Sequence, residues 1–392
     1  MKKTVAFNTV SQLIGKAMSA AATFIVTFFV ARTLGAAGYG DFVKITTYVA
    51  FFYLLADFGV NAVYLQQDES QSSWQSLFVL RTLGSVLLMV LAWCIVSVLP
   101  GAAGQGYTQV ARLGILLYSP TILLQAWITT ANAVFQKRLR YDLATWAIFF
   151  GSLGTVGLLF FHASALVALG IGMGITACIS LYFALRLHPV SSWNISIKDL
   201  VKLLVPSLPL GMTLIFNLVY FRADSVVITL TRPTVEVGMY GLAYKVFEVI
   251  LVFPTFFMNA VYPLMIQGKI KRIFIKSAIF LSLVSCFLSL IVWFAAPLLS
   301  LIKNDFTPSI AALRVLSLGL PFFFVTSATM WALIALKKQK ILAAIYGLSM
   351  IVNIVGNILL VPRYGFMAAA WLTVACEGLV LLISEIVLAH EL

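Results

Sequence analysis

The chain has 392 residues, of which 62% are hydrophobic and 10% are charged, and its mean hydropathy is +1.04. These values exclude a soluble globular domain and a disordered chain, because too few polar side chains are present to cover a water-facing surface. The net charge of +13 does not indicate nucleic-acid binding, because the basic residues gather at the ends of apolar segments. The composition predicts an integral membrane protein.

Twelve apolar segments follow one another along the chain, each long enough to cross a hydrocarbon core of about 30 Å. They cover residues 6–31, 42–64, 77–99, 110–134, 141–161, 163–186, 203–230, 238–264, 273–299, 310–335, 341–361 and 365–389. None alternates with a period of two, which favours helices over a barrel. The first lacks a small-residue cleavage site and is too long for a signal peptide, so we expect a retained helix.

The basic residues predict the orientation in the membrane. With a cytoplasmic N-terminus, the inner ends and loops hold 16 of them: Lys2, Lys3, Arg81, Lys137, Arg138, Arg140, Arg186, Lys198, Lys202, Lys269, Lys271, Arg272, Lys276, Lys337, Lys338 and Lys340. The outer ends hold 7: Arg32, Lys44, Arg112, Arg232, Lys303, Arg314 and Arg363. The positive-inside rule then places both termini in the cytoplasm.

Several short patterns recur about 200 residues apart. Asn61-Ala62-Val63-Tyr64 returns at 259–262, Gly38-Tyr39-Gly40 returns within 238–241, and the basic run at 137–140 returns at 337–340. Arg112 and Pro120 are echoed by Arg314 and Pro321. Six crossings return the chain to its starting side, so the two copies have the same orientation, and such a repeat is typical of transporters. We therefore predict an all-α fold with an N-terminal six-helix bundle (1–187), a cytoplasmic linker (188–200) and a C-terminal six-helix bundle (201–392), related by a parallel pseudo-twofold axis.

Ionisable residues inside predicted helices are candidate functional groups, because each costs at least about 2.5–3.5 kcal/mol at the centre of a membrane helix. They are Lys16, Asp57, Asp224, Lys245, Glu248 and Glu377, with Arg222 as a further candidate. On the first helix, Lys16 lies in a polar stripe with Asn8, Gln12, Ser19, Thr23 and Thr27. This stripe indicates either an aqueous cavity or helix–helix hydrogen bonds, and we favour the cavity.

Similar polar faces occur on three other helices. Asn61 shares a face with Tyr53, Asp57 and Tyr64, and Asn259 shares one with Lys245, Glu248 and Tyr262. Lys245 and Glu248 are three residues apart, so we expect them to pair, as a structural bridge or as part of a site. Asn217, Tyr220 and Asp224 share a third face, from which Arg222 points away toward the outer interface or the cavity. Glu377 is either a proton carrier or a protonated acid packed between helices.

Signatures of enzymes and metal proteins are missing from the sequence. No His, Cys, Asp or Glu residues have metal-ligand spacing, and no glycine-rich phosphate loop follows a strand. The four cysteines form no CxxC pair and all fall within predicted helices. We predict no enzymatic activity, no cofactor and no metal.

Five stretches resemble the Wzx-type oligosaccharide flippases of the multidrug/oligosaccharidyl-lipid/polysaccharide (MOP) exporter superfamily. They are residues 31–40 (ARTLGAAGYG), 222–225 (RADS), 237–245 (VGMYGLAYK), 311–316 (AALRVL) and 357–365 (NILLVPRYG). The resemblance implies twelve helices in two bundles around a central cavity, in a bacterial inner membrane. It also implies an undecaprenyl-pyrophosphate-linked oligosaccharide as substrate, membrane lipids around it, and a polysaccharide polymerase and chain-length regulator as partners.

The polar residues suit such a substrate, which has an anionic head and a long apolar tail. We expect cationic contacts from Lys16, Lys245 and Arg222, hydrogen bonds from Asn8, Gln12, Asn61, Asn217 and Asn259, and ring contacts from Tyr53, Tyr220 and Tyr244. A cation-coupled multidrug exporter of the same superfamily is one alternative, disfavoured by the lysines. A membrane-embedded glycosyl or acyl transferase is the other, disfavoured by the missing catalytic cluster.

The intramembrane carboxylates predict coupling to H⁺ or Na⁺, because the predicted loops are too short to hold an ATPase. The candidates are Asp57, Asp224, Glu248 and Glu377. Asp57 has no cation on its own helix, so its charge is balanced by Lys16, by a bound ion or by protonation. A fixed Asp57–Lys16 bridge is the structural alternative to coupling.

The orientation can be tested in a variant whose four native cysteines are replaced by alanine. A membrane-impermeant thiol reagent added outside should label single cysteines placed at Ala103 or Lys303, but not at Arg138 or Lys338. Labelling at Lys338 without permeabilisation would reverse the predicted orientation.

Overall fold

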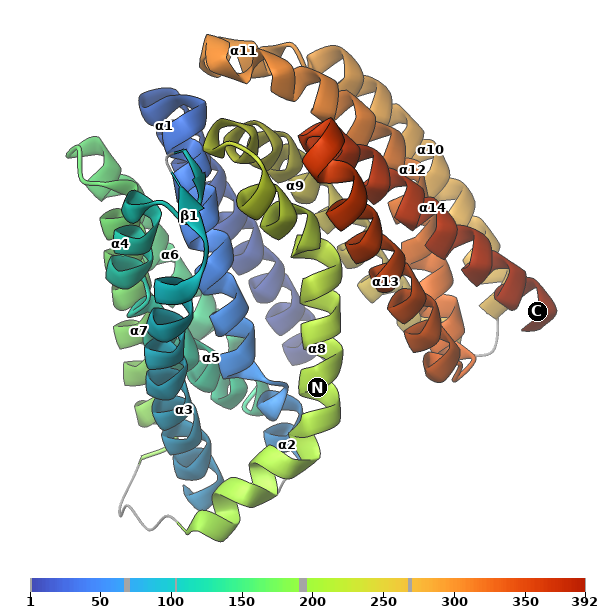
Figure 1. The fold of residues 1–392 in the computed structure, drawn as a ribbon. Helices are drawn as coiled ribbons and strands as arrows, with labels where there is room; N and C mark the ends of the chain where they lie inside the picture. The colour runs from blue at the N-terminus through green and yellow to red at the C-terminus, as the bar shows by residue number, and fades with distance from the viewer. Residues whose placement is uncertain (1, 67–70, 103, 190–195, 267–269, 392) are drawn as a thin grey trace. The chain divides into compact units, whose positions relative to one another are not determined.

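The computed structural model describes residues 2–66, 71–102, 104–189, 196–266 and 270–391. Nearly all of them are helical, as expected (Figure 1). The helices before residue 189 are α1 (Lys2–Asp57), α2 (Val60–Gln66), α3 (Gln71–Val98), α4 (Gln109–Tyr118), α5 (Thr121–Lys137), α6 (Tyr141–Phe160) and α7 (Ala165–Leu187). Those after it are α8 (Ile197–Thr231), α9 (Thr234–Ile266), α10 (Ile270–Ala295), α11 (Leu298–Ile302), the 3₁₀ helix η1 (Asn304–Phe306), α12 (Thr307–Ala335), α13 (Gln339–Tyr364) and α14 (Phe366–Glu391). An unpredicted hairpin pairs β1 (Gly101–Ala102) with β2 (Gln105–Gly106).

Eleven helical stretches of the described chain are long and apolar enough to cross a membrane. The first, Val10–Gln66, has 57 residues and is long enough for two crossings of about 20 residues each. The helix is interrupted at Gly35, whose φ of 68° and ψ of −172° are not helical. The two apolar segments predicted between residues 6 and 64 therefore correspond to the two arms of this kinked helix, the second of which continues past Asp57 into α2. Each of the twelve predicted segments is mostly helical.

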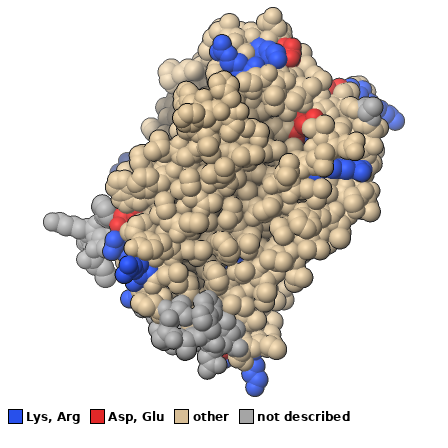
Figure 2. All heavy atoms as spheres, turned by 90° about the vertical axis from the view of Figure 1, so that its left-hand side faces the viewer, with Lys and Arg blue, Asp and Glu red and all other residues tan. Residues whose placement is uncertain are grey.

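The exposed side chains are of the kind that contact lipid. Large apolar side chains are exposed on many helices, among them Leu87, Phe161, Leu283 and Phe294. On the face shown in Figure 2, most charged side chains lie at the top and upper right or along the lower left edge and the bottom, and a broad band between these two groups shows almost no charge. Such a band is what contact with hydrocarbon requires.

Contacts divide the chain into two compact units. The first contains residues 1–30, 44–100 and 107–218, and the second contains residues 31–43, 101–106 and 219–392. Helix α8 contributes its residues up to Leu218 to the first unit and the rest to the second. The bundle boundaries predicted at residues 187 and 201 stay a prediction.

In the first unit, α6 packs on α7, α7 on α5, and α5 on α3. The α6–α7 contact depends on two glycines, because a Cβ atom at Gly151 would meet the main-chain oxygen of Gly172 at 2.6 Å, and one at Gly172 would meet that of Gly151 at 2.7 Å. Thr155 and Thr176, one turn beyond each glycine, bond back to these same carbonyl oxygens at 3.0 and 2.9 Å. Small residues of this kind let membrane helices approach closely without a hydrophobic driving force.

In the second unit, α12 packs against α9, α10 and α14, and α14 also packs against α13. Residues 31–43 of α1 cross the beginning of α9 closely. A Cβ atom at Gly238 would meet the carbonyl oxygen of Ala36, and one at Gly40 would meet that of Thr234. Gly40 and Gly238 belong to the glycine pattern that recurs about 200 residues apart, so equivalent parts of the two repeats contact each other here.

The α6–α7 contact gives a stability prediction. Gly151→Ala should destabilise the protein by about 1–3 kcal/mol, because the new methyl group overpacks against Gly172 and Thr176. Gly157→Ala is the matched control on the same helix, because a Cβ atom there meets nothing within 4 Å. Thermal unfolding of the purified variants measures the difference, and equal melting temperatures would contradict it.

Candidate functional site

The second unit contains a cluster of three charged side chains that are partly exposed. Glu248 pairs with two cations: Lys245 Nζ lies 3.0 Å from Glu248 Oε2, and Arg222 Nη2 lies 2.8 Å from Glu248 Oε1. The Lys245–Glu248 pair expected from the spacing on one helix face is confirmed. Between 26% and 35% of each side chain is exposed. These three side chains, which we call the cation cluster, sum to one excess positive charge, and the buried carboxylate of Asp224 lies on the same helix two residues from Arg222 and interacts with it electrostatically.

Arg222 reaches this cluster from α8, although the sequence placed it away from the polar face of that helix. Its guanidinium carbon lies 5.7 Å from the centre of the Tyr244 ring, a cation–π distance. The Tyr244 hydroxyl in turn donates to the main-chain oxygen of Phe221 at 3.3 Å. Tyr244 itself is buried, and its ring contacts the guanidinium of the partly exposed Arg222.

Two other predicted carboxylates of this unit bond to hydroxyl groups. Asp224 is buried, accepts from the Tyr240 hydroxyl, and accepts from the main-chain nitrogen of Ser225 at 2.6 Å. Glu377 is 2% exposed and accepts from the Tyr220 hydroxyl at 3.0 Å. Neither has a salt bridge to any residue that the structure describes.

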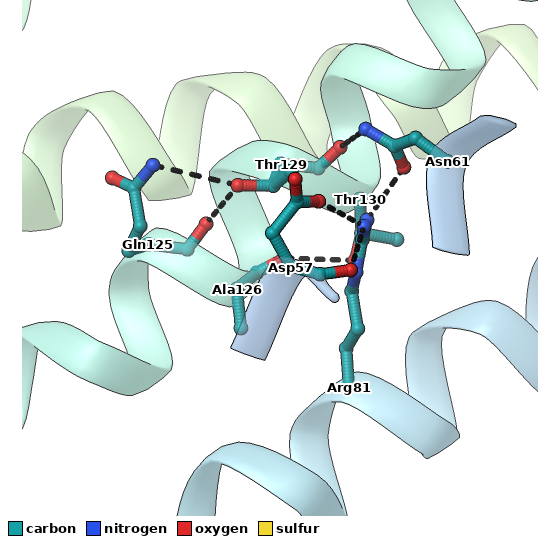
Figure 3. Close-up of polar contacts among 7 residues, drawn as sticks. All are labelled: Asp57, Asn61, Arg81, Gln125, Ala126, Thr129 and Thr130. Atoms are coloured by element: carbon teal, nitrogen blue, oxygen red, sulfur yellow. Dashed lines mark hydrogen bonds and ion pairs between the residues drawn. The ribbon is translucent and has the colours of Figure 1, made fainter. Parts of the chain in front are cut away.

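The first unit contains a second charged group, centred on Arg81 (Figure 3). Arg81 Nη2 lies 2.5 Å from Asp57 Oδ1, and Nη1 donates to Asn61 Oδ1 at 2.7 Å. The Arg81 side chain is 1% exposed, whereas that of Asp57 is 31% exposed. The sequence interpretation considered Lys16, a bound ion or protonation as the counter-charge of Asp57 and overlooked Arg81, which supplies it.

Arg81 joins the two sides of a helix break. Helix α1 ends at Asp57, and the chain turns through Phe58 and Gly59, both with positive φ, before α2 carries Asn61. Arg81 Nη2 also donates to the main-chain oxygen of Asp57 at 3.3 Å, one of the carbonyl groups left without a partner at a helix end. A cation at this end also suits the helix dipole.

Arg81 was missed because the predicted apolar segment began at residue 77, which made Arg81 a cation near its cytoplasmic end. In the structure α3 begins at Gln71, so Arg81 lies ten residues into the helix and is buried. Lys44, which the sequence placed at an outer end, is also buried. If Arg81 and Lys44 are left out of the count of basic residues, the predicted cytoplasmic side still holds more of them than the outer side.

Two residues predicted to bind substrate make hydrogen bonds between helices of the first unit. Asn8 is 3% exposed, and its Oδ1 accepts from the main-chain nitrogen of Tyr141, the first residue of α6. The Tyr53 hydroxyl shares a hydrogen bond with Thr121 Oγ1 at 2.6 Å. The roles predicted for Asn8 and Tyr53 as substrate ligands stay predictions.

The remaining predicted ligands are not brought together by any contact described above. Lys16 and Asn259 are exposed, and Gln12 is half-buried. The side chain of Asn217 lies outside the described residues. The roles predicted for these residues as substrate ligands stay predictions, as do those of Tyr220 and Tyr244, both of which are buried. Among the described residues, no three His, Cys, Asp or Glu side chains gather as metal ligands do.

Comparison with known families gives two matches. The family model described as "Polysaccharide biosynthesis protein" matches residues 2–269, and the MatE model matches residues 209–359. No curated protein matches the chain.

Solved structures with the same fold are numerous. The lipid II flippase MurJ in an inward closed conformation has a TM-score of 0.78 at 14% identity, covering 98% of this chain and 87% of its own. An inward-facing multidrug resistance MATE transporter of the MOP superfamily has a TM-score of 0.72 at 11% identity, with 95% and 96% covered. A MOP superfamily transporter from Pyrococcus furiosus, whose title reports reverse polarity of the binding pocket, has a TM-score of 0.61 at 14% identity, with 98% and 94% covered. At these identities the likeness shows the fold, which is that of the two-bundle transporters.

Proposed function

Because the chain belongs to the polysaccharide biosynthesis protein family, a family of transporters and flippases rather than enzymes, we propose that it is a flippase for an undecaprenyl-pyrophosphate-linked oligosaccharide. The substrate would be the repeat unit of an O-antigen, capsule or exopolysaccharide. The protein would move it from the cytoplasmic to the periplasmic leaflet of a bacterial inner membrane by alternating access. Both termini would lie in the cytoplasm, and a polymerase and a chain-length regulator would take up the product.

The observation that carries this proposal is the cation cluster of Arg222, Lys245 and Glu248. A pyrophosphate cannot enter hydrocarbon, so a flippase has to offer it cations at membrane depth. The cluster has one excess positive charge, and all three side chains are partly exposed. An incoming phosphate would compete with Glu248 for charge-assisted hydrogen bonds from Arg222 and Lys245.

A cation-coupled multidrug exporter is the second candidate, and the MatE match over residues 209–359 favours it. Such a transporter needs an anionic or aromatic surface for its cargo. The excess positive charge of the cation cluster opposes a cationic drug. Efflux of ethidium from proteoliposomes tests this alternative, and we expect none.

Charge removal tests the flippase directly. In proteoliposomes holding the lipid-linked oligosaccharide of a producing strain, Lys245→Ala should lower translocation at least about tenfold, because a hydrogen bond to a charged group contributes about 1.5–3 kcal/mol. Lys245→Arg should retain part of the activity, and Lys16→Ala should also impair translocation.

Lys198→Ala is the matched control, because Lys198 is exposed at the beginning of α8 and outside the cluster. It should transport like the parent. Normal translocation by both Lys245→Ala and Lys16→Ala would refute the cationic contacts.

We propose that Glu377 couples transport to an ion gradient. A buried carboxylate that has only a hydroxyl donor is costly to keep ionised, so binding H⁺ or Na⁺ would stabilise it. Asp57 and Glu248 are held by salt bridges instead. Asp224 already accepts two hydrogen bonds.

Glu377→Gln should therefore abolish the response of transport to an imposed pH or sodium gradient, each applied separately. Glu385→Gln is the control, because Glu385 lies eight residues after Glu377 on the same helix and also accepts a hydrogen bond from a hydroxyl group, that of Thr329. If Glu377→Gln still responds like the parent, Glu377 is not the coupling residue, and Asp57, Asp224 and Glu248 are the candidates left.

A further inference from the structure

We infer that a polar face of the first unit, formed by Asp57, Asn61, Gln125 and Thr129, binds hydroxyl groups of the transported sugar (Figure 3). This inference rests on the proposed function and adds which part of the substrate this face recognises. The four residues come from the end of α1, from α2 and from two successive turns of α5. We call them the sugar face.

Hydrogen bonds connect the sugar face into one continuous group. Gln125 Nε2 donates to Thr129 Oγ1 at 3.4 Å, and Asn61 Nδ2 donates to the main-chain oxygen of Thr129 at 3.4 Å. Asn61 is joined through Arg81 to Asp57. The side chains are thus neighbours whose positions are fixed by each other and by the buried Arg81.

The same hydrogen bonds leave specific polar atoms available. Arg81 uses Oδ1 and the main-chain oxygen of Asp57, and the second carboxylate oxygen bonds to no residue that the structure describes. Likewise, within the described chain, Gln125 Oε1 accepts no hydrogen bond, and the amide of Asn61 has one N–H to spare. Asp57, Asn61, Gln125 and Thr129 are all partly exposed. A ligand at this face would find acceptors and donors side by side.

The charge of the face decides which ligand it suits. Asp57 is the exposed member of its salt bridge and Arg81 the buried one, so a phosphate would meet the carboxylate first and be repelled. A metal ion would meet the guanidinium only 2.5 Å from Asp57 Oδ1. Neutral hydroxyl groups are repelled neither by the carboxylate nor by the guanidinium. They can donate hydrogen bonds to the carboxylate, and they can both donate to and accept from the side-chain amides. These are the groups that an oligosaccharide presents.

Thr130 shows that the arrangement is confined to one side of α5. It adjoins Thr129 in sequence, but it is 0% exposed and its hydroxyl bonds to the main-chain oxygen of Ala126 at 2.8 Å. The Thr129 hydroxyl makes the equivalent bond to the main-chain oxygen of Gln125 at 2.7 Å, but Thr129 is partly exposed. Thr130 is therefore a control for Thr129 that differs from it in burial.

Binding to the full-length protein in lipid nanodiscs tests the inference with two probes. One is the lipid-linked oligosaccharide isolated from a producing strain, and the other is sugar-free undecaprenyl pyrophosphate. The parent should bind the sugar-bearing lipid more tightly. Gln125→Leu and Asp57→Asn should each weaken that binding about tenfold and leave binding of the sugar-free lipid unchanged, whereas Lys245→Ala should weaken both.

The controls separate binding from folding. Thr129→Val should weaken binding of the sugar-bearing lipid only, and Thr130→Val should change the binding of neither lipid. If Asp57→Asn lowers the melting temperature by disturbing Arg81, Gln125→Leu alone decides, because the Gln125 side chain bonds to Thr129 and, within the described chain, forms no hydrogen bond with Asp57 or Arg81. If Gln125→Leu weakens binding of both lipids equally, or weakens binding of neither, the inference that the sugar face binds the sugar is wrong. Failure of the parent to bind either lipid would overturn the proposed function itself.

Discussion

A charged side chain inside a membrane helix has to find its partner within the protein, because hydrocarbon offers neither water nor counter-ions. The described part of this chain meets that requirement in three ways. Arg81 is buried against Asp57 and Asn61, Glu248 is held between two cations, and Glu377 accepts a hydrogen bond from a hydroxyl group. The choice of partner determines what each group can still do. Both terminal nitrogens of Arg81 are used by Asp57 and Asn61. The cation cluster keeps an excess charge, and Glu377 has no salt bridge to a cation in the part of the chain that the structure describes.

The two units, each taken by itself, therefore offer different chemistry. The second unit exposes positive charge at Lys245 and Arg222, which suits a phosphate group. In the first unit, the sugar face has its cation, Arg81, buried and exposes a carboxylate and two amides, which suits hydroxyl groups. A lipid-linked oligosaccharide contains both kinds of group, whereas a cationic drug has no phosphate for the cation cluster to bind. The division of polar chemistry between the units thus supports the substrate class proposed.

Close packing in this fold depends on glycine at a few crossings, since helices in lipid associate through short-range contacts. Gly151 and Gly172 allow α6 and α7 to meet in the first unit. Gly40 and Gly238 allow residues 31–43 to cross α9 in the second. The second crossing explains why a glycine pattern recurs in both halves of the sequence, because the equivalent segments press their main chains against each other and leave no room for a Cβ atom.

The sequence by itself determined the membrane class, the twelve apolar segments and the resemblance to flippases, because hydropathy and helical period are local properties of the chain. It also determined the Lys245–Glu248 pair, since three residues on one helix set that distance. Only the tertiary structure decided the contacts between helices. It decided that Asp57 pairs with Arg81, 24 residues away, and that Asn8 bonds to Tyr141, 133 residues away. It decided too that Gln125 and Thr129 join Asn61 in one polar face. Side-chain partners across helices depend on which faces meet, on where helices break and on their rotation, and no local pattern of residues encodes these three things.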